Sequence, residues 1–311
     1  CRRTPPGEKQ AARMQAHSVR GSKHNERISV AGQDIYPCSV CGESRGEAFR
    51  CFFNGYGGLI KLWRCRMCGY VAQNIGPGRW TPPDDLAGGA VEGFLGSGDR
   101  WMYPHRWRAL MDIRRQISKV CPSGRLLDVG GGDGQFLHLC KQADFSCLGI
   151  EPNASLAEHA ANASGVEVTA GRYEAESFPA DSFDIITFIQ VLEHLPNPGE
   201  ALRAAREHLR PGGLLVIEVP SIRSPHWIAW RVTRCGRVLE NRFGVFPEHV
   251  GYYSPKSLTE LTRRAGFQRI SLVTGRWRFK YGGLLRTVAY PIDPLLNRLR
   301  IGGILYMGTN A

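Results

Sequence analysis

The sequence predicts an α/β fold, in which a doubly wound, largely parallel sheet follows a small cysteine-rich module. Two stretches carry this prediction. Residues 125–140 combine a short apolar run, a glycine-dense loop and an apolar-periodic stretch, which is typical of a buried strand, a tight turn and a helix. Residues 38–68 contain two Cys-x-x-Cys-Gly pairs. With 311 residues, the chain is long enough for one full α/β core and a small accessory module.

The composition limits the class of protein. No uncharged apolar run reaches about 18 residues, so we expect no transmembrane helix, and no secretory signal is visible. Four of the ten cysteines have metal-type spacing and the others are scattered, which favours a reducing, cytoplasmic compartment over disulfides. The chain begins at Cys1 rather than Met, so we expect further residues upstream.

The net charge of +12 is concentrated at the two ends of the chain. Residues 1–30 hold seven Lys and Arg against two acids, and residues 221–311 hold fifteen against four. This pattern fits an anionic partner, such as RNA, a phosphorylated small molecule or a membrane surface, and it fits equally a basic solvated face without a specific partner. Residues 1–33 are polar, basic and without periodicity, so we expect a disordered arm there.

Residues 34–73 are predicted to form a zinc ribbon. Two cysteine knuckles lie 23 residues apart, a spacing typical of a tetrahedral zinc site, and the glycine after each knuckle lets it fold back so that amides reach the thiolates. We expect strands at 49–53 and 59–63, joined by a turn at Asn54-Gly55. Because all four ligands are sulfur, the predicted Zn²⁺ is structural rather than catalytic. The ligands are Cys38, Cys41, Cys65 and Cys68.

The glycine-dense loop does not have the spacing of a dinucleotide site. The pattern G-x-G-x-x-G fails whether it is counted from the first or the second alternate glycine, and D-x-G-x-G-x-G is present instead. An acid just before the loop disfavours a pyrophosphate and suits a cationic ligand. The residues of the pattern are Asp128, Gly130, Gly132 and Gly134. They resemble the first motif of the class I S-adenosylmethionine-dependent methyltransferases, whose loop surrounds the methionine part of that sulfonium cofactor.

This resemblance implies a Rossmann-like, doubly wound sheet of seven strands over residues 101–274, with a helix at 101–121 before the first strand. The Gly- and Pro-rich residues 74–100 are expected to be a linker. The apolar runs that we expect to form strands, in the order typical of the family, are 126–129, 145–150, 166–170, 184–189, 214–219 and 267–274.

Further candidate cofactor residues follow the glycine loop. Glu151 ends the second expected strand, about twenty residues beyond the loop, where a carboxylate can accept both ribose hydroxyls; an ordinary helix-capping acid is the alternative. Residues 171–184 resemble the family's segment that borders adenine, but Arg172 stands where many members have Asp. We therefore assign Tyr173 and Glu174 to the cofactor site in its place, and Gln190, after the fourth expected strand, is assigned to it as well.

Two histidines are candidate general bases. His194 belongs to a Glu-His pair that resembles one found near the methyl group in family members, and it is expected to be either a base or a residue that shapes the pocket. Glu248 and His249 begin a segment that resembles small-molecule and sugar methyltransferases, whose histidine lies at the acceptor. We expect His249 to be the first candidate base, with the Glu248 carboxylate holding its tautomer, and His194 the second. A structural role for each histidine is the alternative.

The resemblance as a whole implies methyl transfer from S-adenosylmethionine to a small, anionic or saccharide-like acceptor, of the glycan or secondary-metabolite type. The alternatives are an RNA methyltransferase and a non-catalytic cofactor-binding scaffold. Residues 220–253 mix aromatic residues with arginines and are expected to be an acceptor-side insert, or else a packed lid. Residues 275–311 alternate apolar patches with arginines, and we expect peripheral contact with a membrane or with a partner chain. The oligomeric state and the methylated atom stay open.

Overall fold

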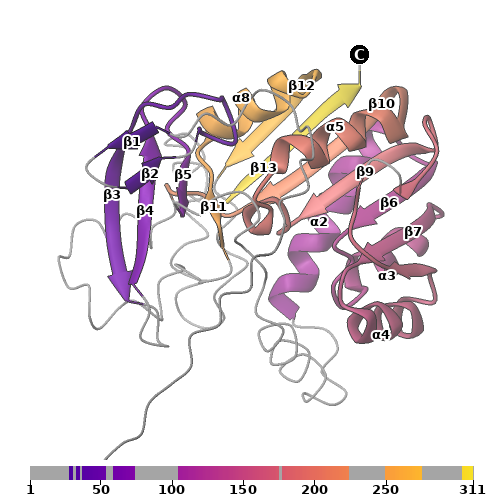
Figure 1. Cartoon of the computed structure of the whole chain (residues 1–311). Coiled ribbons are helices and arrows are strands. Elements are labelled where there is room, and N and C mark those ends of the chain that lie inside the picture. Colours follow the sequence, from indigo (N-terminus) through magenta and orange to yellow (C-terminus); the bar gives the residue numbers. More distant parts are fainter. Residues whose placement is uncertain are drawn as a thin grey trace, which may run out of the picture.

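The computed structural model describes residues 28–30, 33–35, 37–53, 59–73, 104–174, 177–223, 249–274 and 303–310 (Figure 1). Its largest element is a seven-stranded sheet. The strands are β6 (Arg125–Val129), β7 (Ser146–Glu151), β8 (Val168–Ala170), β9 (Phe183–Ile189), β10 (Leu209–Val219), β12 (Phe267–Thr274) and β13 (Ile304–Asn310). Their order in the sheet is β12-β13-β10-β9-β6-β7-β8.

All strands of this sheet run parallel except β13, which pairs antiparallel with β10 on one side and with β12 on the other. The central strands are apolar along most of their length because both of their faces are covered. This sheet confirms the predicted seven-stranded, Rossmann-like class, and every strand expected between residues 126 and 274 is present with bounds shifted by a few residues.

Helices cover both faces of the sheet (Figure 1). They are α2 (Pro104–Val120), α3 (Gln135–Lys141), α4 (Ala154–Ser164), α5 (Pro198–His208), α8 (Pro255–Arg264) and the short 3₁₀ helix η2 (Leu192–His194). Adjacent residues of β6 pack into cores on opposite faces of the sheet, since successive side chains of a strand point to alternate faces. Leu126 packs with Ile113 of α2, whereas Leu127 belongs to the core that contains Leu202 of α5 and Leu258 of α8.

The start of α8 forms a capping box. The Ser254 hydroxyl accepts the backbone N–H of Ser257 at 3.1 Å, the Ser257 hydroxyl accepts that of Ser254 at 2.8 Å, and Pro255 occupies the first turn. Lys256 then donates from Nζ to the backbone oxygen of Met67 at 2.7 Å. The Lys256 contact therefore ties the start of α8 to the second cysteine knuckle.

The ribbon forms a second, four-stranded sheet in the order β11-β5-β4-β3. Its strands are β3 (Gly46–Phe53), β4 (Leu59–Cys65), β5 (Val71–Gln73) and β11 (Gly251–Tyr252). The expected strands at 49–53 and 59–63 are thus present, and the expected turn at 54–55 lies outside the described residues. Strand β11 comes from the segment that we expected to be an acceptor-side insert. The ribbon shares one continuous apolar core with α5, α8 and the large sheet, so it is not a separate body.

Two expectations need correction. Residues 304–310 lay in the segment expected to contact a membrane or a partner, yet they form β13, whose Ile304 and Leu305 are fully buried inside the sheet. The arm expected to be disordered over 1–33 includes β1 (Ile28–Val30), which pairs antiparallel with β2 (Gln33–Ile35). The partner strands of β13 are distant in sequence, so its apolar run alone did not reveal it, whereas β1 and β2 are strands of three residues each, too short to show a periodicity.

The other segment predictions are not tested. The expected linker at 74–100, most of the insert at 220–253 and most of the terminal segments lie outside the described residues. Within the described part of the chain, no helix is both long enough and apolar enough to cross a membrane.

Candidate active site and metal centre

The loop after β6 needs glycine at two positions, each of which approaches a different neighbouring segment. Gly130 has φ +73°, and a Cβ there would lie 2.6 Å from Cγ2 of Val191. Gly134 has φ +78°, and a Cβ there would lie 2.7 Å from the backbone oxygen of Ala160 in α4. Both the left-handed backbone and the close approach exclude a side chain. The loop is therefore pressed between α4 and the segment that follows β9.

Asp128 lies under this loop, near the carboxyl end of β6, and its side chain is buried. Its carboxylate accepts the hydroxyl hydrogen of Thr187 from β9. Burial raises the pKa of Asp128 to about 7, against the opposing effects of the Thr187 hydroxyl and the Arg106 guanidinium. A buried carboxylate that is costly to ionise is stabilised by a neighbouring cation, so this position suits a positively charged ligand.

Glu151 reaches the same loop from the end of β7. One carboxylate oxygen accepts the backbone N–H of Gly132 at 3.1 Å, and the other accepts that of Asn153 at 3.1 Å. Burial raises the pKa of Glu151. The N-cap of α4 is Asn153, whose side chain accepts the N–H of Leu156 at 2.9 Å. The side chain of Asn153 caps α4, so the Glu151 side chain is not the helix cap. Its carboxylate lies at the glycine loop, which is the position that the predicted ribose contact needs.

An ion pair at this loop was missed from the sequence. Arg106, near the start of α2, donates from Nη1 to Oδ2 of Asp133 at 3.2 Å. Asp133 also accepts the side-chain amide of Gln135 at 2.8 Å. The pair ties α2 to the glycine loop, in agreement with the expectation that a helix precedes the first strand. No local pattern links an arginine to an aspartate 27 residues later.

The remaining candidate cofactor residues differ in their surroundings. Gln190 follows β9 with φ +59°; its backbone N–H donates to the backbone oxygen of Glu218 at 2.8 Å, and its side-chain amide donates to the Glu218 carboxylate. Tyr173 packs its ring against Phe178 and shares a hydrogen bond of 2.8 Å between its hydroxyl and Nδ1 of His208. Glu174 is exposed. Gln190 is thus bonded to Glu218 of β10, whereas the ring of Tyr173 packs against the core.

Three titratable side chains converge beyond Gln190. The ring centroids of His194 and His249 are 4.7 Å apart in an edge-to-face arrangement. Glu193 joins them, and the ligand atoms of the three residues all lie within 4.8 Å of one another. Glu193 and His249 are buried. Glu193 was not assigned from the sequence, although its place next to His194 could have suggested it. Glu248 lies outside the described residues.

The cluster of Glu193, His194 and His249 is close to the glycine loop because Val191 connects them. Val191 contacts the loop at Gly130 and directly precedes η2, which carries Glu193 and His194. The cluster and the two buried carboxylates therefore lie at the carboxyl ends of neighbouring strands, where open α/β sheets bind ligands.

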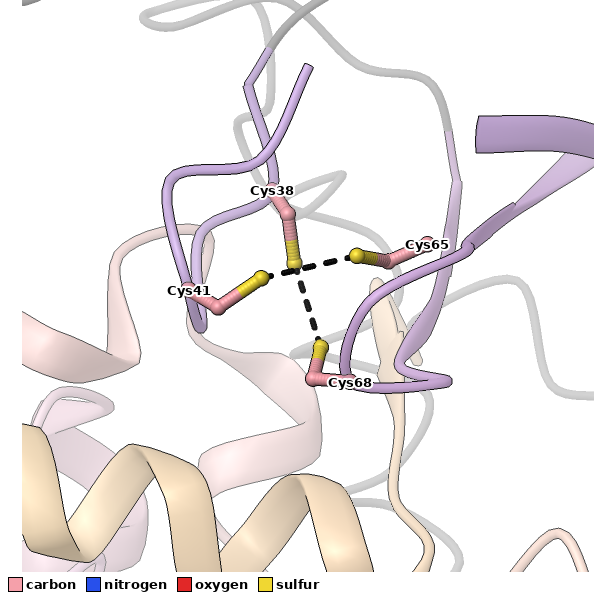
Figure 2. A group of neighbouring side chains, drawn as sticks. All are labelled: Cys38, Cys41, Cys65 and Cys68. Atoms are coloured by element: carbon pink, nitrogen blue, oxygen red, sulfur yellow. Dashed lines mark hydrogen bonds between the residues drawn. The ribbon is translucent and has the colours of Figure 1, made fainter. Parts of the chain in front are cut away.

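The four predicted cysteines come together in one buried cluster (Figure 2). The sulfur atoms of Cys38 and Cys68 are 3.6 Å apart, and those of Cys41 and Cys65 are 3.5 Å apart. A tetrahedral zinc ion with Zn–S bonds of about 2.3 Å separates its sulfurs by about 3.8 Å. The cluster therefore matches a four-thiolate zinc site in donor type, number and size.

The knuckles also have the expected backbone. Gly42 and Gly69 have φ of +71° and +74°, and their amides donate to the oxygens of Cys38 and Cys65. The hydrogen bond between the thiols of Cys38 and Cys68 raises the pKa of Cys38 and lowers that of Cys68. A metal ion binds the thiolate form of cysteine, so a cation bound in this cluster would displace the thiol protons into solvent.

Comparison with known proteins gives a family match. Residues 102–272, more than half of the chain, match the family model described as a methyltransferase domain. The ubiquinone biosynthesis O-methyltransferase of Saccharophagus degradans is 27% identical over 164 residues, which are 51% of this chain and 67% of that protein. The enzyme of the same name from Methylococcus capsulatus is 31% identical over 144 residues, which are 42% of this chain and 60% of that protein.

Solved structures with the same fold have lower identity. An S-adenosylmethionine-dependent methyltransferase from Thermotoga maritima has a TM-score of 0.51 at 22% identity and covers 72% of this chain and 99% of its own. The [4+2]-cyclase SpnF has a TM-score of 0.51 at 17% identity and covers 72% of this chain and 92% of its own. At these identities the likeness concerns the fold alone, and the names of these two proteins, a methyltransferase and a cyclase, indicate that the fold serves more than one reaction.

Proposed function

This chain belongs to the family of S-adenosylmethionine-dependent methyltransferases, and we propose that it methylates an oxygen of a small, anionic or saccharide-like acceptor. The observation that carries the proposal is the cluster of Glu193, His194 and His249 beside the glycine loop. It supplies candidate proton acceptors next to the place where a cationic cofactor fits.

The described residues fit the cofactor. Asp128 and Glu151 supply two buried carboxylates, and Gly130 to Gly134 supply backbone that a ligand can approach closely. S-Adenosylmethionine, when bound, supplies a methyl group activated by a sulfonium. In the proposal, Glu151 accepts hydrogen bonds from the ribose and Asp128 faces the positive end of the ligand. Gln190, Tyr173 and Glu174 stay predictions for the remaining contacts.

The chain's own contribution to the reaction is to orient the acceptor and remove its proton. His249 takes a proton from the acceptor hydroxyl, and His194, packed edge-to-face with it, orients the imidazole. A buried base of this kind contributes typically about 10²–10⁴-fold to the rate. Positioning of the two reactants contributes up to about 7–11 kcal/mol. Glu248 stays a prediction as the partner that sets the tautomer of His249.

The acceptor class rests on three supports. The similar curated proteins are named O-methyltransferases, which favours oxygen as the methylated atom. The segment that includes His249 resembles small-molecule and sugar enzymes, which favours a glycan or metabolite. The excess of Lys and Arg over acids in residues 221–311 favours an anionic group on the acceptor.

We also propose that the four-cysteine cluster holds one structural Zn²⁺. All four donors are thiols and all are buried, so the metal would have no open position for chemistry. Contact of the basic ends with RNA or a membrane surface stays a prediction. The structure does not test it, since residues 1–27 and 275–302 lie outside the described part of the chain.

The experiment that tests the proposal is label transfer from methyl-labelled S-adenosylmethionine into two separate pools. One pool is total RNA, and the other is an extract of nucleotide sugars, glycolipids and metabolites. We expect label in the second pool, lost when His249 is replaced by alanine. Label in RNA alone would refute the acceptor class and favour the basic ends as the substrate-binding surface. Cofactor binding without any labelled product would favour a scaffold.

A further inference from the structure

One strand of the methyltransferase domain belongs to the ribbon's sheet. Strand β11 pairs antiparallel with β5, with Gly251 opposite Ala72 and Tyr252 opposite Val71. Figure 1 shows β11 beside the ribbon, although five of the seven strands of the large sheet, β6 to β10, separate β11 from β5 in sequence. The residue two positions before this strand is His249. The ribbon therefore contacts the candidate base through the backbone.

The last residue of β5 binds the backbone on either side of the His249–Val250 junction. Gln73 donates its side-chain amide to the backbone oxygen of His249 at 2.9 Å. Its backbone N–H donates to the oxygen of Val250, also at 2.9 Å. These two bonds fix the peptide that carries the imidazole. Gln73 lies only five residues after Cys68.

A second set of contacts leads from the knuckle to the other members of the cluster. Tyr70 closes the knuckle, since its backbone oxygen accepts the N–H of Cys65 at 2.9 Å. Its buried ring packs against the fully buried ring of Tyr253, with centroids 5.1 Å apart. The Tyr253 hydroxyl donates to the backbone oxygen of Leu192 at 3.1 Å, at the start of η2. Glu193 and His194 follow directly.

The fit between the knuckle and β11 is tight. A Cβ on Gly251 would lie 1.9 Å from the hydroxyl oxygen of Tyr70, so any side chain at this position would displace the tyrosine. The cofactor carboxylates are bonded elsewhere: Asp128 by Thr187, and Glu151 by the amides of the loop and of α4. The ribbon is thus coupled to the acceptor side of the site, while the cofactor side is held by the large sheet.

We propose that the ribbon is the positioning element of the acceptor site: Zn²⁺ on its cysteines sets β5 and Tyr70, which hold His249 against Glu193 and His194. Gln73 and Tyr70 are positioning residues in this scheme. Loss of the metal releases residues 249–253 and stops methyl transfer, but leaves the cofactor site formed. The loss of methyl transfer rests on the proposed function, whereas the release of residues 249–253 does not depend on it.

The first test follows the backbone rather than the activity. Hydrogen exchange of the full chain is compared with zinc bound and after removal of zinc by a chelator. We expect exchange of the amides in residues 249–253 to rise roughly tenfold or more, with residues 125–129 and 183–189 unchanged. Unchanged exchange at 249–253 would overturn the proposal. Faster exchange in all three segments would make the ribbon a general stabiliser, and would also overturn it.

The second test keeps the zinc in place. Gln73→Met removes the amide donor at nearly constant size, and Gln116→Met is the matched control, because Gln116 donates to Asp112 within α2, away from the site. We expect Gln73→Met to bind zinc and S-adenosylmethionine as the parent does, with kcat reduced about tenfold, and Gln116→Met to retain full kcat. An undiminished kcat for Gln73→Met would overturn the proposal.

The two proposals fail in different ways. If label enters RNA rather than small molecules, the proposed acceptor is wrong, but the effect of Gln73→Met on kcat is still measurable with RNA. If no acceptor is found, the hydrogen-exchange comparison decides the role of the ribbon by itself.

Discussion

The contact between Gly130 and Val191 joins the cofactor loop to the acceptor side, and replacing Gly130 by alanine tests it. The new Cβ would lie 2.6 Å from Cγ2 of Val191, at a backbone φ of +73°. Left-handed backbone costs a residue with a Cβ about 1–2 kcal/mol, and overpacking costs about 1–3 kcal/mol more. We therefore expect Gly130→Ala to lower the free energy of unfolding by about 2–5 kcal/mol.

Gly132→Ala is the matched control for this prediction. Gly132 also has a positive φ, of +54°, but the nearest atom to its Cβ is 3.8 Å away. Only the backbone term of about 1–2 kcal/mol then applies. Val191→Ala removes the clashing methyl, so the double variant Gly130→Ala/Val191→Ala should recover about 1–3 kcal/mol relative to additive single changes.

Urea unfolding measures these free energies, and calorimetric titration with S-adenosylmethionine measures the effect on the site. We expect the cofactor affinity to fall with Gly130→Ala and to recover in part in the double variant. The reasoning is refuted if Gly130→Ala costs no more than Gly132→Ala, or if the double variant shows no favourable coupling.

Further predictions concern the two carboxylates, the base and the metal. Glu151→Ala should abolish S-adenosylmethionine binding, and retained affinity in calorimetry would remove Glu151 from the cofactor site. His249→Ala should keep that affinity but lose about 10²–10⁴-fold in turnover; an undiminished rate would exclude it as the base. Because burial raises the pKa of Asp128 to about 7, the ligand-free fold should lose stability as pH rises from about 4 to 7, by up to about 4 kcal/mol. Asp128→Asn should remove that loss in urea unfolding at pH 5 and 8, and an equal pH slope in both proteins would contradict it. Cys65→Ser should lower the zinc content from about one per chain and lower Tm; unaltered zinc content would exclude Cys65 as a ligand.

Features that depend on neighbouring residues were predictable from the sequence. The apolar run of β6 and the glycines after it are local, because buried parallel strands are continuous and tight turns require glycine. The two cysteine knuckles were equally predictable, since two residues between the cysteines of each pair allow both sulfur atoms to bind one metal ion. The capping box of Ser254 and Ser257 at the start of α8 is likewise a local feature, because both residues lie within one turn.

Features that depend on distant pairing were not predictable. Strand β11 is two residues long, and nothing in Gly251-Tyr252 indicates that it completes a sheet with residues 71–72. The Arg106–Asp133 pair and the packing of Tyr70 on Tyr253 likewise arise only when distant segments meet. Glu193 belongs to the Glu-His pair that carried the resemblance but was given no role, because only the fold brings its carboxylate to His249.

The position of β13 has a consequence for how the chain folds during synthesis. β10 is complete at Val219, but its neighbour β13 begins only at Ile304, and β12 pairs with β13 alone. At about 5–20 residues per second, the ribosome takes roughly 4–17 s to deliver the missing strand. Throughout that interval the apolar edge of β10 is open to pairing with other nascent chains. We therefore expect the yield of folded chain to depend on how well this edge is protected while residues 220–303 are translated.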